Sequence, residues 1–300
     1  MSRPNTPRLC FIGFGEAGQA IASGLRGVGV EMMSAWDILF PKPEGARLRE
    51  AGQKIGVRLG TSAADAVRGS DIVVSAVTAA SSLEAARSVK DHLTGQFFLD
   101  INSVSPGRKL ETAKELGDAG RYVDVAVMAP VHPARHQTPI MLAGPHAETI
   151  GPLLSELGMK LSVAEGDVGA AAAIKMVRGV MIKGIEALTA ECFLAATRAG
   201  VADQVMKSLS NNYPALDWSK VIEYNLERMA THGGRRAAEM EEVADTLREL
   251  GVEPLMALAT VARQREMGEL GKQPEVATAK TQSRDKMLAA ISEAANEKKN

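Results

Sequence analysis

Short apolar runs alternate with amphipathic stretches over the first half of the chain. The runs are rich in Val, Ile and Phe, as strands are, and helical stretches such as Glu16–Gly27, Ser81–His92 and Gly107–Leu116 lie between several of them. The expected strands are Arg8–Ile12, Val30–Ala35, Asp71–Val77, Phe97–Ile101, Tyr122–Val127, Pro139–Ala143 and Lys160–Val163. This alternation predicts βαβ units and a mostly parallel sheet.

The second half has a different pattern. The β signal ends near Gly166, and helix-forming sequence follows, with a polar end at residues 293–300 that we expect to fray. The expected helix interruptions are Gly200, Pro214, Gly233–Gly234, Gly251, Pro254, Gly271 and Pro274. We therefore predict an α/β domain over residues 1–165 and an all-α domain over residues 166–300.

A long apolar segment joins the two domains. Residues 168–198 contain no proline and are rich in Ala, Leu, Ile and Met, so they predict one helix of roughly 45 Å. It is apolar around most of its circumference, and we expect protein to cover most of its surface. Such a helix would bridge the domains and offers an oligomer interface.

Composition and charge narrow the classes of function. The chain has 300 residues, about two domains' worth, and 45% of them are hydrophobic, enough for sizeable cores without disulfide or metal staples. Lys and Arg (35) nearly balance Asp and Glu (36), which argues against nucleic-acid binding. Cys10 and Cys192 make no disulfide framework, and no Cys/His cluster has metal-site spacing.

The composition also predicts a soluble, cytoplasmic protein. No window of about 18 residues is apolar and free of charge, so we expect no membrane span. The apolar stretch after Arg8 is broken by glycines and Glu16 within a few residues, which does not match a signal peptide.

A glycine-rich turn follows the first expected strand. It has the form G-x-G-x-x-G and leads into the helix expected from Glu16. In dinucleotide-binding domains the first glycine allows the turn, the second lets the backbone approach a pyrophosphate, and the third lets helix and strand pack closely. The helix N-terminus would supply N–H groups to the phosphates. The expected cofactor-binding residues here are Gly13, Phe14, Gly15, Glu16, Ala17 and Gly18. A plain strand–helix turn is the alternative.

Asp37 stands 19 residues after Gly18, just past the second expected strand. A carboxylate at that place accepts hydrogen bonds from an adenosine ribose and would repel a 2′-phosphate. This favours NAD over NADP, although Lys42 and Arg47 nearby keep NADP open. A Rossmann-like domain is predicted by this order of features: a strand, the glycine-rich turn, a helix, a second strand and the acidic residue. The alternative for Asp37 is a role as a turn or cap residue before Pro41.

Two lysines in the long helix are candidates for proton transfer. Oxidation of an alcohol by a nicotinamide needs a group that takes the hydroxyl proton, and burial lowers the pKa of a lysine amine toward that task. Helical geometry places Lys175 and Glu186 about 20° apart and Lys183 about 80° from Lys175. One face would then carry two cations and a carboxylate. An exposed stripe of lysines is the alternative.

Four segments in a fixed order carry a resemblance to a known family. They are IGFGEAGQAIASGL, the WDI of Trp36–Ile38, FLDINSVSP, and GDVGAAAAIKMVRG at Gly166–Gly179. The set resembles the β-hydroxyacid dehydrogenases, which include 3-hydroxyisobutyrate and 6-phosphogluconate dehydrogenases, and within them the branch whose all-α C-terminal domain has no assigned function. The resemblance covers nearly the whole chain. It implies NAD(P), a small-molecule substrate, and a helical domain that closes over the substrate and mediates a homodimer.

The same resemblance assigns roles to single residues. Lys175 takes the place of the family's general acid/base lysine in its G-x-x-G-x-x-x-x-x-K segment. Ser103 falls where the family has a Ser or Thr beside the nicotinamide. We count Val77, at the end of an expected strand, with the cofactor-binding residues as well.

The substrate-binding positions depart from the family. Gly179 stands where the family has an Asn four residues after its lysine. In the family's D-A-P-V-S-G-G segment, Met128 replaces the serine, and Ala129 and Pro130 replace the glycines; Pro130 has no N–H to donate. Where the family has a later K-D-L segment, this chain has Glu241-Glu242-Val243, so the second family lysine is absent. These changes leave the redox role of Lys175 in place and would fit a bulkier substrate than a small aliphatic hydroxyacid.

Other polar groups are candidates to replace the missing ones. Lys183 lies one turn beyond Gly179, and His132 lies two residues past Pro130. Arg235 and Arg236 are expected at a helix start, where adjacent arginines can bind a carboxylate or phosphate, or else form a solvated turn. Met128, Met176 and Met181 would line an apolar pocket or belong to the core. The residues assigned to substrate binding are Met128, His132, Gly179, Lys183 and Arg236.

The sequence therefore predicts an NAD(P)-dependent oxidoreductase. Hydride would pass between nicotinamide and a β-hydroxyacid-like or bulkier hydroxy or keto substrate, with Lys175 as general acid/base. One alternative is an imine reductase of the same architecture. The other is a dinucleotide-binding protein without chemistry, which the losses at Met128, Gly179 and Glu241 favour and the presence of Lys175 and Ser103 opposes.

Overall fold

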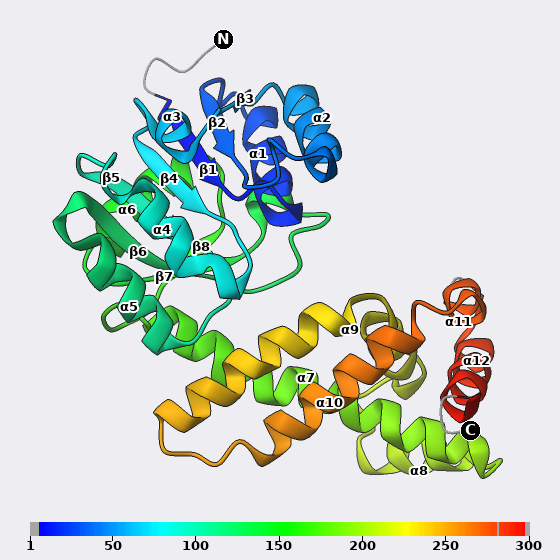
Figure 1. The fold of residues 1–300 in the computed structure, drawn as a ribbon. Helices are drawn as coiled ribbons and strands as arrows, with labels where there is room; N and C mark the ends of the chain where they lie inside the picture. The colour runs from blue at the N-terminus through cyan, green and yellow to red at the C-terminus, as the bar shows by residue number, and fades with distance from the viewer. Residues whose placement is uncertain (1–5, 281, 298–300) are drawn as a thin grey trace. The chain divides into compact units, whose positions relative to one another are not determined.

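The computed structural model of the chain describes residues 6–280 and 282–297. It divides into two compact units, Met1–Lys175 and Met176–Asn300 (Figure 1). The division falls ten residues after the domain boundary expected from the sequence. The reason is local, because the start of the long helix packs on the first unit, where Ala171 is buried with Ala126 and Ala143.

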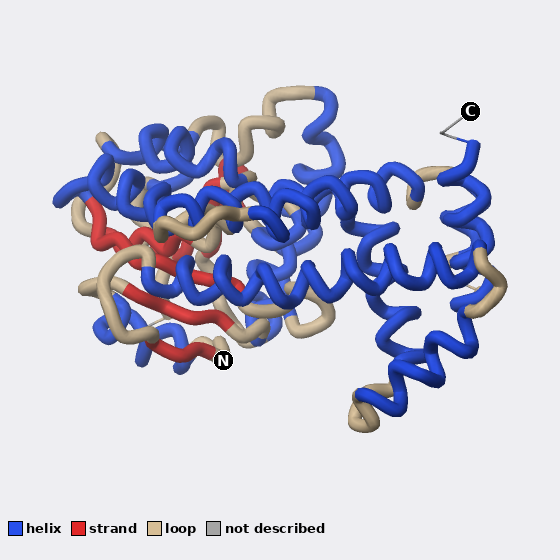
Figure 2. Tube along the Cα trace, turned by 90° about the horizontal axis from the view of Figure 1, so that it is seen from below, coloured by secondary structure: helices blue, strands red, loops and turns tan. Residues whose placement is uncertain are grey.

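The strands that the structure describes form one eight-stranded sheet in the first unit (Figure 2). They are β1 (Leu9–Ile12), β2 (Met33–Trp36), β3 (Arg58–Leu59), β4 (Ile72–Ser75), β5 (Gln96–Asp100), β6 (Gly120–Val127), β7 (Ile140–Ala143) and β8 (Leu161–Val163). Their order is β3-β2-β1-β4-β5-β6-β7-β8, and neighbours are parallel except β6 and β7. The order 3-2-1-4-5-6 is that of Rossmann domains. The predicted Rossmann-like fold is confirmed.

Helices cover both faces of this sheet. They are α1 (Glu16–Gly27), α2 (Ala46–Ile55), α3 (Ala63–Val67), α4 (Ser82–Lys90), α5 (Pro106–Leu116) and α6 (Ala147–Glu156). Because side chains alternate along a strand, Leu9 and Phe11 of β1 join one apolar core, which also holds Leu25 of α1, while Cys10 and Ile12 join the other. A sheet buried on both faces explains why its strands read as apolar runs.

The strand register brings four loops to one edge of the sheet. Ile12 lies beside both Trp36 and Ser75, and Ser75 lies beside Asp100. The loops that follow β1, β2, β4 and β5 therefore begin next to one another. In open parallel sheets this carboxyl edge, where the strand order reverses, is where ligands bind.

The second unit is helical. Helix α7 (Ala170–Arg198) begins in the first unit and continues into the second, as the sequence predicts. It is followed by α8 (Ala202–Asn212), α9 (Trp218–Glu249), α10 (Leu255–Leu270), α11 (Pro274–Ala279) and α12 (Arg284–Glu297). The residues expected to fray are helical as far as Glu297, and residues 298–300 lie outside the described residues. The main apolar core of the second unit includes the buried residues Phe193, Leu226 and Met267.

One predicted helix boundary is wrong. Helix α9 continues through Gly233–Gly234, so Arg235 and Arg236 lie within the helix rather than at its start. A Cβ on Gly233 would overlap the carbonyl oxygen of Gln264 and lie 2.6 Å from the backbone nitrogen of Gly268. The glycine is there because α9 and α10 lie side by side at close range (Figure 1), and this packing outweighs the low helix propensity of glycine.

Helix α7 is less covered than its composition predicts. Six apolar side chains on it are each 41–64% exposed: Ile174, Val177, Met181, Ile182, Ile185 and Leu188. Their spacing of three and four residues places most of them on one side of the helix. The single chain therefore leaves this apolar stripe uncovered.

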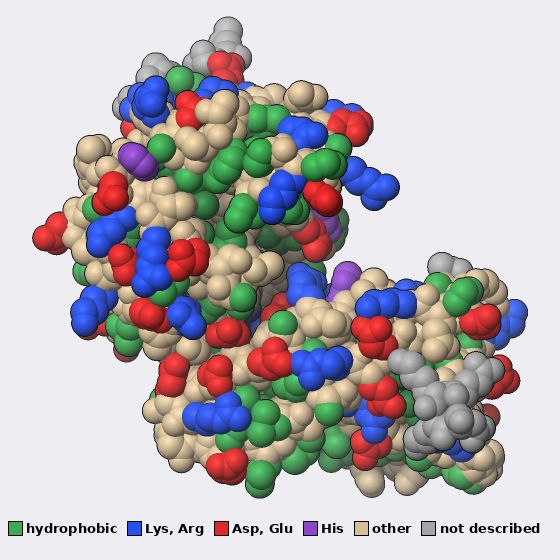
Figure 3. Space-filling view, viewed as in Figure 1, with side chains coloured by type: hydrophobic (Ala, Val, Ile, Leu, Met, Phe, Trp, Pro, Cys, Tyr) green, Lys and Arg blue, Asp and Glu red, His purple; other side chains and the backbone are tan. Residues whose placement is uncertain are grey.

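The surface otherwise has a mixed charge. On the face in Figure 3, acidic and basic side chains are interspersed, in keeping with a formal charge of −1. Within residues 6–280 and 282–297, none of the helices combines the length and the apolar character that a membrane crossing requires. Cys10 is buried and Cys192 exposed, and neither forms a disulfide.

Candidate active site

The glycine loop follows β1 and leads directly into α1. Gly13 has a φ of +87°, and a Cβ there would overlap the carbonyl oxygen of Ala76 and lie 2.7 Å from Cγ1 of Val77. A side chain on Gly18 would lie 2.8 Å from the carbonyl oxygen of Gly13. Both positions therefore require glycine, the first because the loop after β1 touches the loop after β4, and the second because α1 packs tightly on its own entry turn.

Gly15 serves a different purpose. No described atom lies within 4 Å of a Cβ built on it, and it is the N-cap of α1 without any side-chain capping bond. The N-cap residue thus provides no side-chain oxygen to the first N–H groups of α1, which suits an anion-binding helix N-terminus. These residues fit the pyrophosphate of a dinucleotide. The ring of Phe14 is fully buried and packs against Phe11 and Phe40, and this packing anchors the glycine loop to the core.

Asp37, just past β2, is directed at the glycine loop. Its Oδ2 accepts a hydrogen bond of 2.8 Å from the backbone nitrogen of Phe14, and its Oδ1 accepts one of 2.9 Å from that of Leu39. The turn role weighed for this residue is therefore present. The carboxylate also lies at the place that the ribose prediction requires, and ribose binding stays a prediction.

Asn102, which was not predicted from the sequence, links the next two loops. Its Oδ1 accepts a hydrogen bond of 2.7 Å from the backbone nitrogen of Val77, and its Nδ2 donates one of 2.9 Å to Oγ of Ser75. The side chain is buried. A polar residue that directly follows a buried strand at the carboxyl edge is the signal that would have pointed to it.

Lys175 and Ser103 meet in the structure. The Nζ of Lys175 donates a hydrogen bond of 2.5 Å to Oγ of Ser103, and both side chains are half-buried. Ser103 stands beyond the end of β5, directly after Asn102, and Lys175 lies near the start of α7. Two residues to which the family resemblance assigns roles, 72 positions apart, thus form one pair at the edge where the glycine loop begins.

Asp124 of β6 holds the start of α7. Its Oδ2 accepts hydrogen bonds of 3.1 Å from the backbone nitrogens of Gly169 and Ala172. A carboxylate at a helix N-terminus satisfies unpaired N–H groups and complements the helix dipole. Since Lys175 follows Ala172 by less than one turn, this contact contributes to the position of its amine.

Met128 and His132 are the predicted substrate residues of the first unit. Met128 packs on the small core formed by Ala126, Ala143 and Ala171. His132 is exposed. Their role in substrate binding stays a prediction.

Those of the second unit lie in or beside ion pairs. The Nζ of Lys183 is 3.2 Å from Oε2 of Glu239 and 3.5 Å from the position of a Cβ on Gly179. The lysine amine therefore occupies the space beside Gly179. Arg236 is buried and its Nε donates a hydrogen bond of 2.9 Å to Oε2 of Glu186, the carboxylate that we expected to share a helix face with Lys175.

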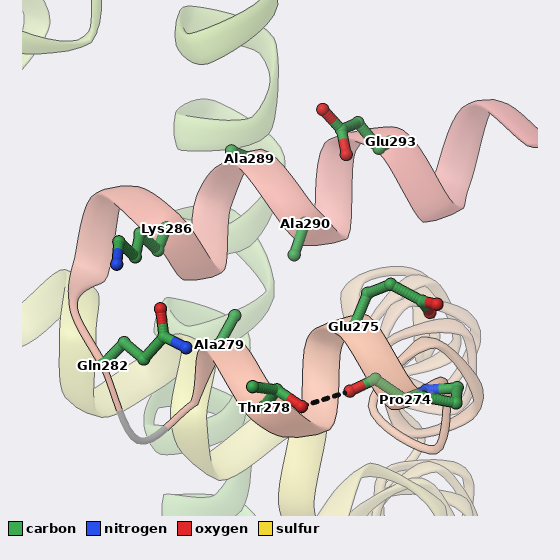
Figure 4. Close-up of a pocket in the computed structure, with 9 residues that line it drawn as sticks. All are labelled: Pro274, Glu275, Thr278, Ala279, Gln282, Lys286, Ala289, Ala290 and Glu293. Carbon is green, nitrogen blue, oxygen red and sulfur yellow. Dashed lines mark hydrogen bonds between the residues drawn. The ribbon is translucent and has the colours of Figure 1, made fainter.

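A separate pocket of about 450 Å³ lies between α11 and α12 (Figure 4). Alanines, Glu275, Glu293 and Lys286 line it, and Thr278 donates a hydrogen bond of 2.8 Å to the carbonyl oxygen of Pro274. None of the residues predicted for cofactor or substrate lines it, and it carries no cluster of reactive groups.

Two family models match parts of the chain. Residues 8–104 match the family described as NADP oxidoreductase coenzyme F420-dependent, and residues 196–267 match a domain of unknown function, DUF1932. The first match spans the glycine loop, Asp37 and Ser103. The fold and this match define the class: the protein is a dinucleotide-binding oxidoreductase.

Three relatives narrow the class to a family. A conserved hypothetical protein from Sinorhizobium meliloti 1021 is 34% identical, with 97% of each chain covered and a TM-score of 0.78. A conserved protein of unknown function, whose structure has similarity with 3-hydroxyacid dehydrogenases, is 31% identical over 89% of this chain and 100% of that chain, with a TM-score of 0.69. The 2-(hydroxymethyl)glutarate dehydrogenase of Eubacterium barkeri is 26% identical over 216 residues, 67% of each chain. The chain belongs to the β-hydroxyacid dehydrogenase family, in the branch with a C-terminal domain of unknown function, as the sequence predicts.

Proposed function

We propose that the protein is an NAD(P)-dependent dehydrogenase that acts on the hydroxyl-bearing carbon of a hydroxyacid or a bulkier hydroxy compound. One observation carries the proposal. The amine of Lys175 is hydrogen-bonded to Ser103 at 2.5 Å, at the carboxyl edge of the sheet where the glycine loop also begins. An amine beside a dinucleotide-binding edge is the arrangement that proton transfer coupled to hydride transfer needs.

Four loops supply the groups that would hold the cofactor. The N-terminus of α1 would bind the pyrophosphate, Asp37 the adenosine ribose, and Val77 and Ser103 would lie at the nicotinamide end. The carboxylate of Asp37 disfavours a 2′-phosphate, so we expect NAD to bind more tightly than NADP. When bound, the nicotinamide supplies or accepts the hydride.

Lys175 would move the proton. In the oxidation its Nζ would accept the hydroxyl proton as the alcohol becomes a carbonyl, and in the reduction Nζ would return a proton to the carbonyl oxygen. The Oγ of Ser103 accepts one N–H of this amine and so holds Nζ in a fixed direction. Removing the hydroxyl of Ser103 should therefore impair the orientation of the Lys175 amine more than it impairs cofactor binding.

The substrate class is inferred from a relative and from the chain's own cations. The Eubacterium barkeri relative is named for a hydroxyacid, 2-(hydroxymethyl)glutarate. A carboxylate substrate needs a cationic or N–H partner. The sequence offers His132 and Lys183 as candidates, besides the apolar Met128 and the small Gly179. Lys183 and Arg236 both pair with a carboxylate, but Glu186 accepts two hydrogen bonds from the guanidinium of Arg236, so Arg236 is the weaker candidate.

We further propose that the protein forms a homodimer through α7. The stripe from Ile174 to Leu188 is apolar and exposed in the single chain, and exposed apolar patches of this kind mark association sites. A second copy of the chain would cover it, because a like helix offers a matching stripe across a two-fold axis.

A substrate panel tests the proposed activity. Purified protein is assayed with NAD⁺ and NADP⁺ on 3-hydroxyisobutyrate, 2-(hydroxymethyl)glutarate and L-serine, and with NADH and NADPH on cyclic imines. We expect oxidation of at least one hydroxyacid with NAD⁺. Turnover of imines without alcohol oxidation would replace the proposal with an imine reductase. Binding of NAD⁺ without turnover of either set would favour a protein that binds the cofactor and does no chemistry.

A further inference from the structure

A buried ion cluster lies within the first unit, next to the loops of the candidate site. Lys109 of α5, Asp100 at the end of β5 and Asp124 of β6 have side chains that are 1%, 0% and 0% exposed. The Nζ of Lys109 is 3.1 Å from Oδ1 of Asp100 and 3.5 Å from Oδ1 of Asp124, and it donates a hydrogen bond of 2.5 Å to the carbonyl oxygen of Asp100. One ammonium is therefore shared by two carboxylates.

Stability alone does not account for this cluster. Burial of three charges is costly, and well-packed apolar side chains in their place are often at least as stable. The hydroxyl of Tyr122 donates a hydrogen bond of 2.7 Å to Oδ2 of Asp100. Burial and the charge of Asp100 raise the pKa of Tyr122 well above its ordinary value, so this hydroxyl remains a donor. Tyr122 thus keeps Oδ2 of Asp100 hydrogen-bonded. The further contacts of the two carboxylates point to a role in positioning.

Each carboxylate leads to one member of the Lys175–Ser103 pair. Oδ1 of Asp100 accepts a hydrogen bond of 2.9 Å from the backbone nitrogen of Asn102, which fixes the turn that carries Ser103. Oδ2 of Asp124 accepts the two N–H groups at the start of α7, the helix that carries Lys175. Lys109 joins the two carboxylates, and through them the two segments.

We propose that Lys109 is a positioning residue for the Lys175–Ser103 pair. Its ammonium holds Asp100 and Asp124 together, and this sets the loop after β5 against the first turn of α7. The effect on turnover rests on the proposed dehydrogenase function, whereas the effect on the pair itself does not.

The test replaces Lys109 with a neutral side chain of similar length. K109M is compared with K114M, an exposed lysine of the same helix α5. The first readout is competitive acetylation of the full-length protein with acetic anhydride, followed by peptide mass spectrometry, which measures the reactivity of each lysine against pH. We expect K109M to raise the reactivity of Lys175 about three-fold or more, because its hydrogen bond to Ser103 is loosened, and K114M to leave it unchanged.

The second readout is steady-state kinetics with NAD⁺ and the best hydroxyacid of the panel. We expect kcat to fall about ten-fold or more in K109M with little change in the Kd of NAD⁺, as a misplaced catalytic group does.

A second variant keeps the test valid if K109M does not fold. The double variant K109M/D124N removes one cation and one anion, so it keeps the net charge of the cluster, and the Asn oxygen still accepts the N–H groups of α7. We expect the same rise in Lys175 reactivity from it. Unchanged reactivity of Lys175 in whichever of these variants folds would overturn the proposal. If the wild-type protein oxidises no hydroxyacid, the proposed function fails, while the acetylation result still decides the role of Lys109.

Discussion

Adjacent glycines in α9 should respond in opposite ways to the same substitution. A Cβ on Gly233 would lie 2.6 Å from the backbone nitrogen and 2.7 Å from the Cα of Gly268. A Cβ on Gly234 would have no described atom within 4 Å beyond its chain neighbours and its own helix backbone. Ordinary carbon contacts are about 3.5 Å, so G233A must push α10 away by at least ~0.8 Å. The obstacle is backbone, which cannot rotate aside.

The magnitudes follow from two opposing terms. Overpacking costs about 1–3 kcal/mol, and about 2–3 kcal/mol where the obstacle is backbone; replacement of glycine by alanine in a helix gains about 1 kcal/mol. We expect G233A to lower the free energy of unfolding by about 1–2 kcal/mol and G234A to raise it by about 1 kcal/mol. The two melting temperatures should differ by about 5–10 °C.

Thermal unfolding followed by circular dichroism at 222 nm measures this directly, since the second unit is helical. G234A is the matched control, because it has the same helix, the same substitution and the next position. Equal shifts in the same direction for the two variants would refute the account of the α9–α10 contact.

Three further predictions concern the cofactor, pH and assembly. D37A should weaken NAD⁺ binding more than NADP⁺ binding by calorimetry; an equal loss for both would contradict the ribose assignment. Burial and the charge of Arg135 lower the pKa of His136 from its ordinary 6.5. The unfolded chain then binds a proton that the folded chain excludes, so the free energy of unfolding should fall as the pH drops below about 6.5. H136Q should reduce this dependence of the free energy of unfolding on pH. The same pH dependence in H136Q and wild type would contradict the role of His136. M181E should shift the protein toward monomer in light scattering, whereas L110E, at an exposed leucine of α5, should not; a dimer unaffected by M181E would place the interface elsewhere.

Much of the fold could be predicted from the sequence because its signals are local. The apolar runs that became β1, β4 and β5 are buried on both faces, and the uninterrupted Ala- and Met-rich segment became α7. The Gly233–Gly234 break was wrong because a glycine that disfavours a helix in isolation is required where a second helix passes close by. That contact joins residues more than 30 positions apart, and no local pattern reveals it.

The candidate site, like the fold, has parts that could be predicted from the sequence and parts that could not. Roles for Gly13–Gly18, Asp37 and Lys175 could be predicted because their chemistry is tied to a short motif or a recognisable segment. Lys109 was missed, although it shares the buried face of α5 with Thr112 and Leu116, a spacing of three and four residues that would have flagged a buried lysine. Its partners Asp100 and Asp124 come from separate strands, so only the sheet register brings the three together.

The most direct measurement of the central claim is the hydride-transfer rate of K175M. In single-turnover experiments with NAD⁺ and the best hydroxyacid of the panel, we predict a fall of about 10²–10⁴-fold, with the Kd of NAD⁺ within about two-fold of wild type, because the amine moves a proton and does not hold the cofactor. A variant that keeps most of its hydride-transfer rate would contradict the account.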